Sequence, residues 1–240
     1  MIRASNLLGV GLYSPADAAL YARVPTQLLT RWVYGTKSGD SVIEPQVDDS
    51  DDRIITFLDF VQTLAIRRIR QERRISLEKI RQAYHLARDQ FGVEYPFALD
   101  TTRIGLFGPP RNKAKQEIWI CVGENDEGAR KYFQLTGRKR NNQLIGEVVL
   151  TYARRLVFDE TGLAREYKAF DTSDGNVLMN PDVRFGEPYL ESCGYTARTL
   201  FEAYQTEGSL ARVAELYGVS ERDVTLAIEY FDHLRPANAA

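Results

Sequence analysis

Residues 11–32 read GLYSPADAALYARVPTQLLTRW, and the start of this stretch carries the signals of a short helix. The Ser14 hydroxyl can accept a hydrogen bond from a free backbone N–H, and Pro15 suits the first helical position. Asp17 places a negative charge near the positive end of the helix. We therefore predict a helix that begins at Pro15 and runs to about Ala22.

A second short helix is predicted directly after the first. Pro25 disfavours helical geometry in the residue before it, so it separates the two helices, and Gly35 suits the end of the second, which should cover 26–34. Residues 36–52 are rich in glycine, proline and acids and predict a loop or wing, with a short strand at Val42–Val47. The two helices are either a helix-turn-helix that enters a DNA groove or part of a core.

Apolar residues recur at steps of three and four in two later segments, which predicts two longer amphipathic helices. The first helix carries its apolar stripe on Phe57, Leu58, Val61, Leu64, Ala65 and Ile69. The second begins at Ser76 and buries Leu77, Ile80, Ala83, Tyr84, Ala87 and Phe91.

Charge is distributed unevenly along the chain, although 31 basic and 33 acidic residues give a formal net charge of −2. Residues 64–88 hold eight arginines and lysines against two glutamates, a balance of +6, whereas residues 200–234 hold two arginines against seven acids, a balance of −5. Arg67, Arg70 and Arg74 fall on one side of their helix, opposite the apolar stripe, where they can meet phosphates. A solvated face is the simpler explanation for an arbitrary basic run, but the helix pair upstream favours DNA.

The rest of the chain predicts short strands and three more helices. Short strands are expected in IGLF, residues 104–107, and in EIWICV, residues 117–122. A turn is expected at Asp-Glu-Thr-Gly, residues 159–162. The last third predicts strands at Val177–Met179 and Pro188–Leu190 and helices at about 196–207, 209–217 and 220–234.

This order of elements predicts a mainly α chain with short β elements. A winged helix-turn-helix domain is expected at 1–98 and a small α/β middle segment at 99–170. Residues 171–240 should form a β-hairpin followed by a helical module that itself resembles a helix-turn-helix.

The composition excludes several classes of protein. Cys121 and Cys193 are separated by 72 positions, and the N-terminal stretch is too weakly apolar for a signal peptide, so we expect reduced thiols and a cytoplasmic location. No apolar run approaches the roughly 20 residues of a membrane span. With His85 and His233 as its two histidines, the chain lacks the usual His/Cys metal cluster.

No catalytic site is predicted. The acidic run Asp48–Asp52 and the pair Asp159-Glu160 are expected in solvated turns, and no sequence motif gives His85 a nucleophile to activate. We therefore expect no enzyme activity, no cofactor and no metal.

The N-terminal part of the chain resembles a known family. The residues that carry the resemblance are Tyr13-Ser14, Ala18, Val24, Leu29 and Arg31-Trp32, then the wing, then FLDFVQTLAIRRIRQERRISLEKIRQA. Over residues 11–88 they look like the winged helix-turn-helix of the MerR-type regulators. The interface expected from this reading places Thr26, Gln27, Thr30 and Arg31 toward the groove and Arg67, Arg70 and Arg74 toward phosphates.

The C-terminal residues resemble a second, smaller unit. The matching positions are Asn180-Pro181, Gly186, Pro188, Gly194, Glu207-Gly208-Ser209, Tyr217-Gly218-Val219-Ser220 and Val224. They are similar to a module of unknown function found in VapB-like antitoxins, and LVFDETGLAREYKAF looks like the segment that precedes it. We expect the glycines to supply turns and Pro188 an edge-strand position, with no chemistry.

Together the two resemblances imply an antitoxin of a type II toxin–antitoxin system. It would bind and inhibit a PIN-domain (VapC-like) ribonuclease toxin and repress its own operon by binding operator DNA. The alternatives are a ligand-responsive MerR-like transcriptional regulator without a toxin partner and a plain interaction scaffold.

A homodimer is expected because a two-fold operator is read by two copies. The apolar residues Val224, Ala227, Ile228 and Phe231 are either the contact between copies or part of an intradomain core. A PIN nuclease site gathers carboxylates around a divalent metal, so its inhibitor should offer cations. The candidates are Arg111, Lys113, Arg138, Lys139, Arg140 and Arg235.

Overall fold

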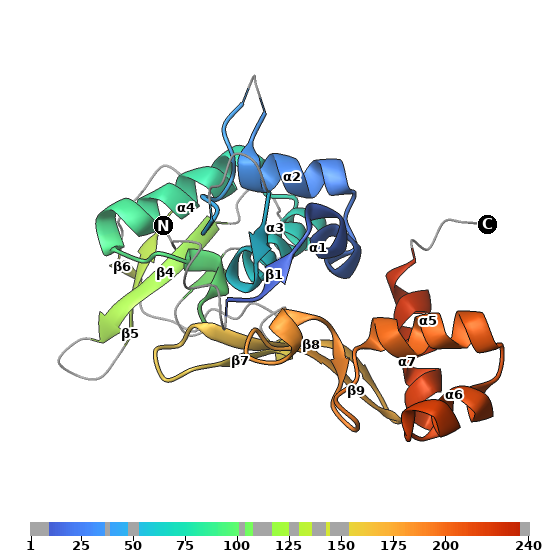
Figure 1. Cartoon of the computed structure of the whole chain (residues 1–240). Coiled ribbons are helices and arrows are strands. Elements are labelled where there is room, and N and C mark those ends of the chain that lie inside the picture. The colour runs from blue at the N-terminus through green and yellow to red at the C-terminus, as the bar shows by residue number, and fades with distance from the viewer. Residues whose placement is uncertain are drawn as a thin grey trace.

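The computed structural model describes residues 10–36, 39–47, 53–100, 104–107, 117–124, 130–135, 143–144 and 154–235. In these residues the chain is mixed α and β, with seven α-helices and three small antiparallel sheets (Figure 1). Helical residues outnumber strand residues, in agreement with the predicted mainly α chain with short β elements. None of the helices in these ranges is both long and apolar enough to cross a bilayer.

The first two helices form where the sequence predicts them. Helix α1 (Pro15–Ala22) begins after Ser14, whose hydroxyl accepts a backbone N–H of the first turn, and ends at Arg23 in left-handed backbone geometry with φ 52°. Helix α2 (Thr26–Tyr34) ends at Gly35 with φ 72°. Both pairs of bounds agree with the prediction.

The strand predicted at Val42–Val47 is wrong. The N–H groups of Val42 and Ile43 both donate to the Trp32 carbonyl, at 2.7 and 3.2 Å, and both side chains are buried. The segment therefore closes the C-terminal end of α2 and has no partner strand among the described residues. Its apolar residues reflect burial against the helices, not a sheet.

The two longer helices form a layer with the first pair. Helix α3 (Phe57–Arg73) starts with a capping box, in which Thr56 and Asp59 each accept the other's backbone N–H. Helix α4 (Leu77–Phe91) starts at Ser76, as predicted. Strands β1 (Leu12–Tyr13) and β2 (Ile55–Thr56) form an antiparallel pair. Most of the predicted apolar stripes are buried in the resulting core.

One four-stranded sheet lies beside α4. It has the order β3-β4-β5-β6, with every neighbouring pair antiparallel. The bounds are β3 (Ile104–Phe107), β4 (Glu117–Glu124), β5 (Arg130–Gln134) and β6 (Gln143–Leu144). Phe91 of α4 packs against Phe133 of β5 with ring centroids 5.3 Å apart. The strands predicted in IGLF and EIWICV are confirmed.

The second four-stranded sheet has the order β10-β9-β8-β7 and is also antiparallel. Its bounds are β7 (Leu156–Phe158), β8 (Ala164–Thr172), β9 (Gly175–Met179) and β10 (Tyr189–Leu190). The turn between β7 and β8 is held by Asp159, whose carboxylate accepts the N–H groups of Thr161 and Leu163 at 2.8 and 3.0 Å. The predicted hairpin of the last third is therefore part of a larger sheet, and β8 runs through residue 170, where the middle segment was predicted to end.

Three helices complete the chain, within one or two residues of their predicted bounds. They are α5 (Ala197–Glu207), α6 (Leu210–Tyr217) and α7 (Glu221–Leu234), and the hydroxyls of Thr196, Ser209 and Ser220 cap their first turns. Short 3-10 turns cover Pro96–Ala98 and Arg184–Gly186.

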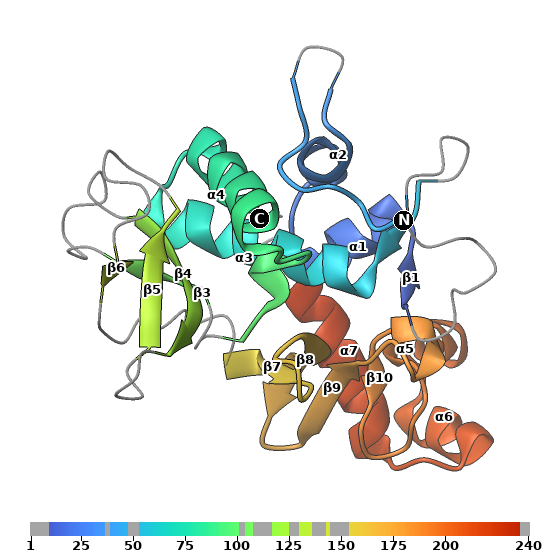
Figure 2. The same ribbon diagram turned by 90° about the vertical axis from the view of Figure 1, so that its left-hand side faces the viewer.

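The second sheet lies between the N-terminal helices and the C-terminal helices (Figures 1 and 2). On β8, Tyr167 packs against Phe60 of α3 with ring centroids 5.9 Å apart, and Phe170 packs against Tyr230 of α7 at 6.0 Å. The Tyr13 hydroxyl also donates to the Gly186 carbonyl at 2.8 Å. These contacts fix α7 relative to α1 and α3.

The predicted dimer residues of α7 contribute to this intramolecular core. Val224 and Ala227 are fully buried, and Ile228 and Phe231 are partly buried against the same core. Phe231 stacks on Phe201 of α5 with centroids 4.4 Å apart. Of the two roles considered, Val224 and Ala227 therefore have the intradomain one.

Candidate functional site

The four residues predicted to face a DNA groove lie together on the exposed side of α2. Thr26, Gln27, Thr30 and Arg31 line one shallow depression, which is completed by Gly35 and Thr36. The opposite side of the helix is anchored in the core by its apolar residues, which are Leu29, Trp32 and Val33. The helix is thus rigidly mounted and presents polar groups to solvent.

The polar side chains on this face of α2 differ in whether they already make a hydrogen bond within the chain. The Thr30 hydroxyl donates to the Thr26 carbonyl one turn earlier, at 2.8 Å, so its oxygen remains free to accept. Gln27 and Arg31 are exposed. An amide and a guanidinium are the groups that pair bidentately with adenine and guanine edges in the major groove. The face therefore offers donors for both purines.

A turn rises beside α2 (Figure 2), and α4 holds its base. Thr36 and Gly39 form an isolated antiparallel bridge across the described part of the turn. Arg81 of α4 donates to the carbonyls of Asp40 and Ser41, at 2.7 and 2.6 Å. One arginine of the basic run is therefore used to position this turn.

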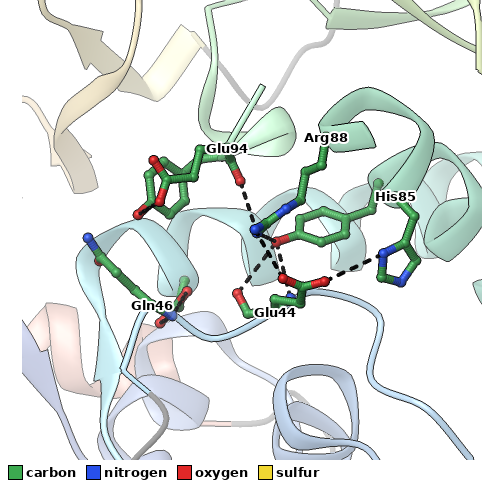
Figure 3. A network of polar contacts seen from close by, with 8 residues as sticks. Glu44, Gln46, His85, Arg88 and Glu94 are labelled. Carbon is green, nitrogen blue, oxygen red and sulfur yellow. Dashed lines mark hydrogen bonds and ion pairs between the residues drawn. The ribbon is translucent and has the colours of Figure 1, made fainter. Parts of the chain in front are cut away.

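A polar network holds the next residues against α4 (Figure 3). Arg88 donates to the Tyr84 hydroxyl at 2.7 Å and lies 3.0 Å from the Glu44 carboxylate. The Glu44 N–H donates to the same hydroxyl at 3.1 Å, and His85 Nδ1 lies 3.7 Å from the Glu44 carboxylate. These contacts fix the segment after the turn, and His85 contributes to the network.

The three arginines predicted to contact phosphates occupy different settings. Arg67 donates to the Ala22 carbonyl at 2.8 Å and is half-buried. Arg70 is exposed, but its guanidinium donates to the Ile75 carbonyl at 2.8 Å across the α3–α4 turn. Arg74 is exposed and closes α3 with φ 53°. None of the three is among the described residues that line the α2 depression.

Arg67 instead belongs to a cavity of about 500 Å³ formed by α1, α3, the β7–β8 hairpin and α7. We call it the arginine cavity. Its described lining consists of Tyr21, Arg23, Leu64, Arg67, Arg68, Arg154, Arg155, Leu156, Tyr167, Ala169, His233 and Leu234. Five of these residues are arginines and none is acidic.

The arginines of the cavity perturb one another and His233. Arg23 Nη1 lies 3.1 Å from His233 Nε2, and because a guanidinium can only donate, that ring nitrogen accepts and the imidazole is neutral. Burial lowers the pKa of His233, and so do the charges of Arg23, Arg155 and Arg67. Burial also lowers the pKa of Arg67, with Arg23 as the next cause. The cavity is strongly electropositive.

Sequence reasoning missed this cavity. The charged lining comes from four separate segments of the chain. Of its residues, only Arg67 was predicted to contact a ligand, and that ligand was DNA. The adjacent pair Arg154-Arg155, just before β7, was the available signal, because two neighbouring guanidinium groups need either solvent or an anion. Nothing in the sequence brings them near Arg23 and His233.

The predicted toxin-binding residues are mostly untested by the structure. Arg111, Lys113, Arg138, Lys139 and Arg140 lie outside the described residues. Arg235 is exposed at the end of α7 and forms an ion pair with Asp232 at 3.1 Å. Within the described ranges, no group of three or more His, Cys, Asp and Glu side chains is placed to hold a metal ion.

Comparisons with known proteins support a fold but no function. No protein-family model matches the chain, and no curated protein matches it. Among solved structures, the chain is similar to the X-ray crystal structure of Rv2018 from Mycobacterium tuberculosis, with 17% sequence identity and a TM-score of 0.58. The similarity covers 90% of this chain and 96% of that chain. The chain therefore shares an overall fold with Rv2018.

Proposed function

We propose that this chain is a DNA-binding antitoxin of the cytoplasm, in which α1 and α2 form a winged helix-turn-helix of the MerR type. The observation that carries the DNA-binding half is the exposed face of α2, where Thr26, Gln27, Thr30 and Arg31 stand together beside a braced turn. A short rigid helix with amide, hydroxyl and guanidinium groups on its free side is the usual means of reading a major groove.

In this proposal, the turn that follows α2 acts as the wing. Its bridged residues Thr36 and Gly39 come directly after the C-terminal end of α2, so the turn can approach the neighbouring backbone or minor groove. Arg74 is exposed at the end of α3 and can supply a phosphate contact. Arg67 and Arg70 already donate to backbone carbonyls, so we assign them a smaller share of DNA binding than their position in sequence implies.

The antitoxin part of the proposal rests on the resemblance of the positions from Asn180 to Val224 to the VapB-like module, and of LVFDETGLAREYKAF to the segment that precedes it. In this proposal the chain binds a PIN-domain ribonuclease toxin, and a homodimer reads a two-fold operator through two copies of α2. Since Val224 and Ala227 are buried within the chain, they are not available for the dimer contact.

The proposal is tested in two steps. First, duplexes are selected from a random pool with the purified full chain, and the selected sequence is compared with the promoter of its own operon. Second, the chain is co-expressed with the product of the adjacent gene. Recovery of a two-fold operator in that promoter, and co-purification of a ribonuclease that the chain inhibits, are the expected results.

Three results contradict separate parts of the proposal. If no duplex sequence is enriched from the pool at any salt concentration, the proposed DNA binding is wrong. If the product of the adjacent gene neither co-purifies with the chain nor cleaves RNA, the proposed antitoxin function is wrong. A monomeric mass in light scattering at micromolar concentration removes the homodimer.

A further inference from the structure

The arginine cavity has the dimensions of a ligand site. Its volume of about 500 Å³ falls within the range of roughly 300–1,000 Å³ that small-molecule sites occupy. It is bounded by a helix end at Arg23, by α3, by the start of β7 and by the end of α7. A single inorganic phosphate is too small to contact all of these walls.

Three arginines of the cavity, Arg23, Arg67 and Arg155, make their described contacts with neutral groups and not with acids. Other arginines have acidic partners, such as Arg198 with Asp17 at 2.6 Å. Arg23 contacts the His233 ring, Arg155 donates to the Ala169 carbonyl, and Arg67 donates to the Ala22 carbonyl and to the Gln71 side-chain amide, all of them neutral groups. Several like charges in a partly enclosed space repel one another, and an anion with several oxygen acceptors relieves that repulsion.

The remaining lining favours an organic anion. Leu64, Leu156, Ala169 and Leu234 are buried aliphatic walls, and the rings of Tyr21 and Tyr167 border the same space. Aromatic rings provide surfaces on which a nucleobase can stack, whereas guanidinium groups pair with phosphate oxygens through two parallel N–H donors. A nucleotide combines both requirements.

The concave shape distinguishes this site from a DNA surface. The phosphates of a duplex lie on the outside of a cylinder, and such a surface can reach Arg154 and Arg155, which are exposed at the rim, but not the half-buried Arg23 and Arg67 within. A small ligand can contact both the rim and the inner arginines.

We propose that the arginine cavity binds a small organic polyphosphate of the nucleoside triphosphate class. Arg23, Arg67 and Arg155 contact its phosphates, and Tyr21 and Tyr167 lie beside its base. The ligand touches α1 and α3 on one side and α7 on the other, so it ties the N-terminal helices to the C-terminal module. This site does not depend on the proposed DNA binding.

The first test uses the unmodified full chain. ATP without magnesium, inorganic tripolyphosphate and adenosine are titrated by calorimetry at about 0.15 M salt. Saturable binding is expected for ATP, weaker binding for tripolyphosphate, and none for adenosine. In parallel, the two histidine ring signals are followed by NMR and assigned with His85→Gln. The His233 signal should move with ATP while the His85 signal stays in place.

The second test uses matched variants. Arg154→Gln together with Arg155→Gln removes two charges from the rim, and Arg165→Gln together with Arg212→Gln removes two exposed charges that do not line the cavity. The first pair should weaken ATP binding by about tenfold or more, since it removes the charge-assisted phosphate contact of Arg155 together with the neighbouring charge of Arg154. The second pair should leave ATP affinity within twofold of the unmodified chain, so the net charge alone is controlled.

Three results overturn the proposal. One is the absence of saturable ATP binding to a folded chain. Another is an equal loss of ATP affinity in both pairs of variants, which means non-specific attraction. The third is a loss of DNA affinity in the Arg154/Arg155 pair without any ATP binding by the unmodified chain, which assigns these arginines to the DNA backbone.

Discussion

Replacing Tyr13 with phenylalanine removes a single hydroxyl from the contact between strand β1 and the C-terminal module. Tyr13 is 3% exposed, and its hydroxyl donates to the Gly186 carbonyl at 2.8 Å. Phenylalanine leaves that buried carbonyl without this donor, which costs about 1–3 kcal/mol of unfolding free energy. For a chain of this length, each kcal/mol corresponds to a fall of roughly 2–4 °C in Tm.

The matching change on the other side is Gly186→Ala. Gly186 has φ 87°, and a Cβ there would lie 2.3 Å from the Tyr13 hydroxyl oxygen. The backbone geometry alone costs roughly 1–2 kcal/mol for a residue with a side chain. The overlap with the hydroxyl adds to that cost, so Gly186→Ala should destabilise more than Tyr13→Phe.

The double variant tests whether these two costs share one cause. Without the hydroxyl, the nearest Tyr13 atom to the new Cβ is Cζ, at 3.0 Å, so most of the overlap disappears. The double variant should therefore be more stable than the sum of the single variants predicts, by about 0.5–3 kcal/mol. Urea denaturation followed by circular dichroism measures all four proteins. Additivity within about 0.5 kcal/mol refutes the direct contact between these residues.

Two further predictions concern polar side chains of α3 and α7. The side-chain amide of Gln62 is fully buried and has no hydrogen-bond partner among the described residues. Gln62→Met should therefore raise the unfolding free energy by about 1 kcal/mol in the same assay, and a loss of stability contradicts this. The pKa of His233 is lowered by burial and by the charges of Arg23, Arg155 and Arg67. Below about pH 6.5, His233 therefore binds a proton more readily in the unfolded chain than in the native chain. Stability should fall as the pH drops below that value, and less steeply in His233→Gln; identical pH profiles for the two proteins contradict the assignment.

Local rules predicted the helices well because their ends are determined by neighbouring residues. Ser14 caps the first turn of α1, as predicted, and α4 begins directly after Ser76, where its start was predicted. The same local rules wrongly predicted a strand at Val42–Val47. Its apolar residues are buried against helices, and its N–H groups find the Trp32 carbonyl, which no local pattern reveals.

The two candidate sites differ in the same way. The α2 face consists of residues one helical turn apart, so Thr26, Gln27, Thr30 and Arg31 could be grouped from sequence alone. The arginine cavity joins residues 23 and 233, whose proximity depends on the docking of α7. For the same reason, sequence could place Arg67 on a helix face but not show that its guanidinium turns toward the Ala22 carbonyl.

That α2 reads DNA is tested most directly by fluorescence anisotropy with the selected operator and a scrambled duplex, over a series of salt concentrations. Arg31→Ala should reduce the preference for the operator by about 1–3 kcal/mol. Arg74→Gln should weaken binding to both duplexes alike and lower the salt slope by about one unit, whereas Arg212→Ala, an exposed control on α6, should change neither. If Arg31→Ala leaves the preference for the operator unchanged in a folded protein, α2 is not the helix that reads DNA.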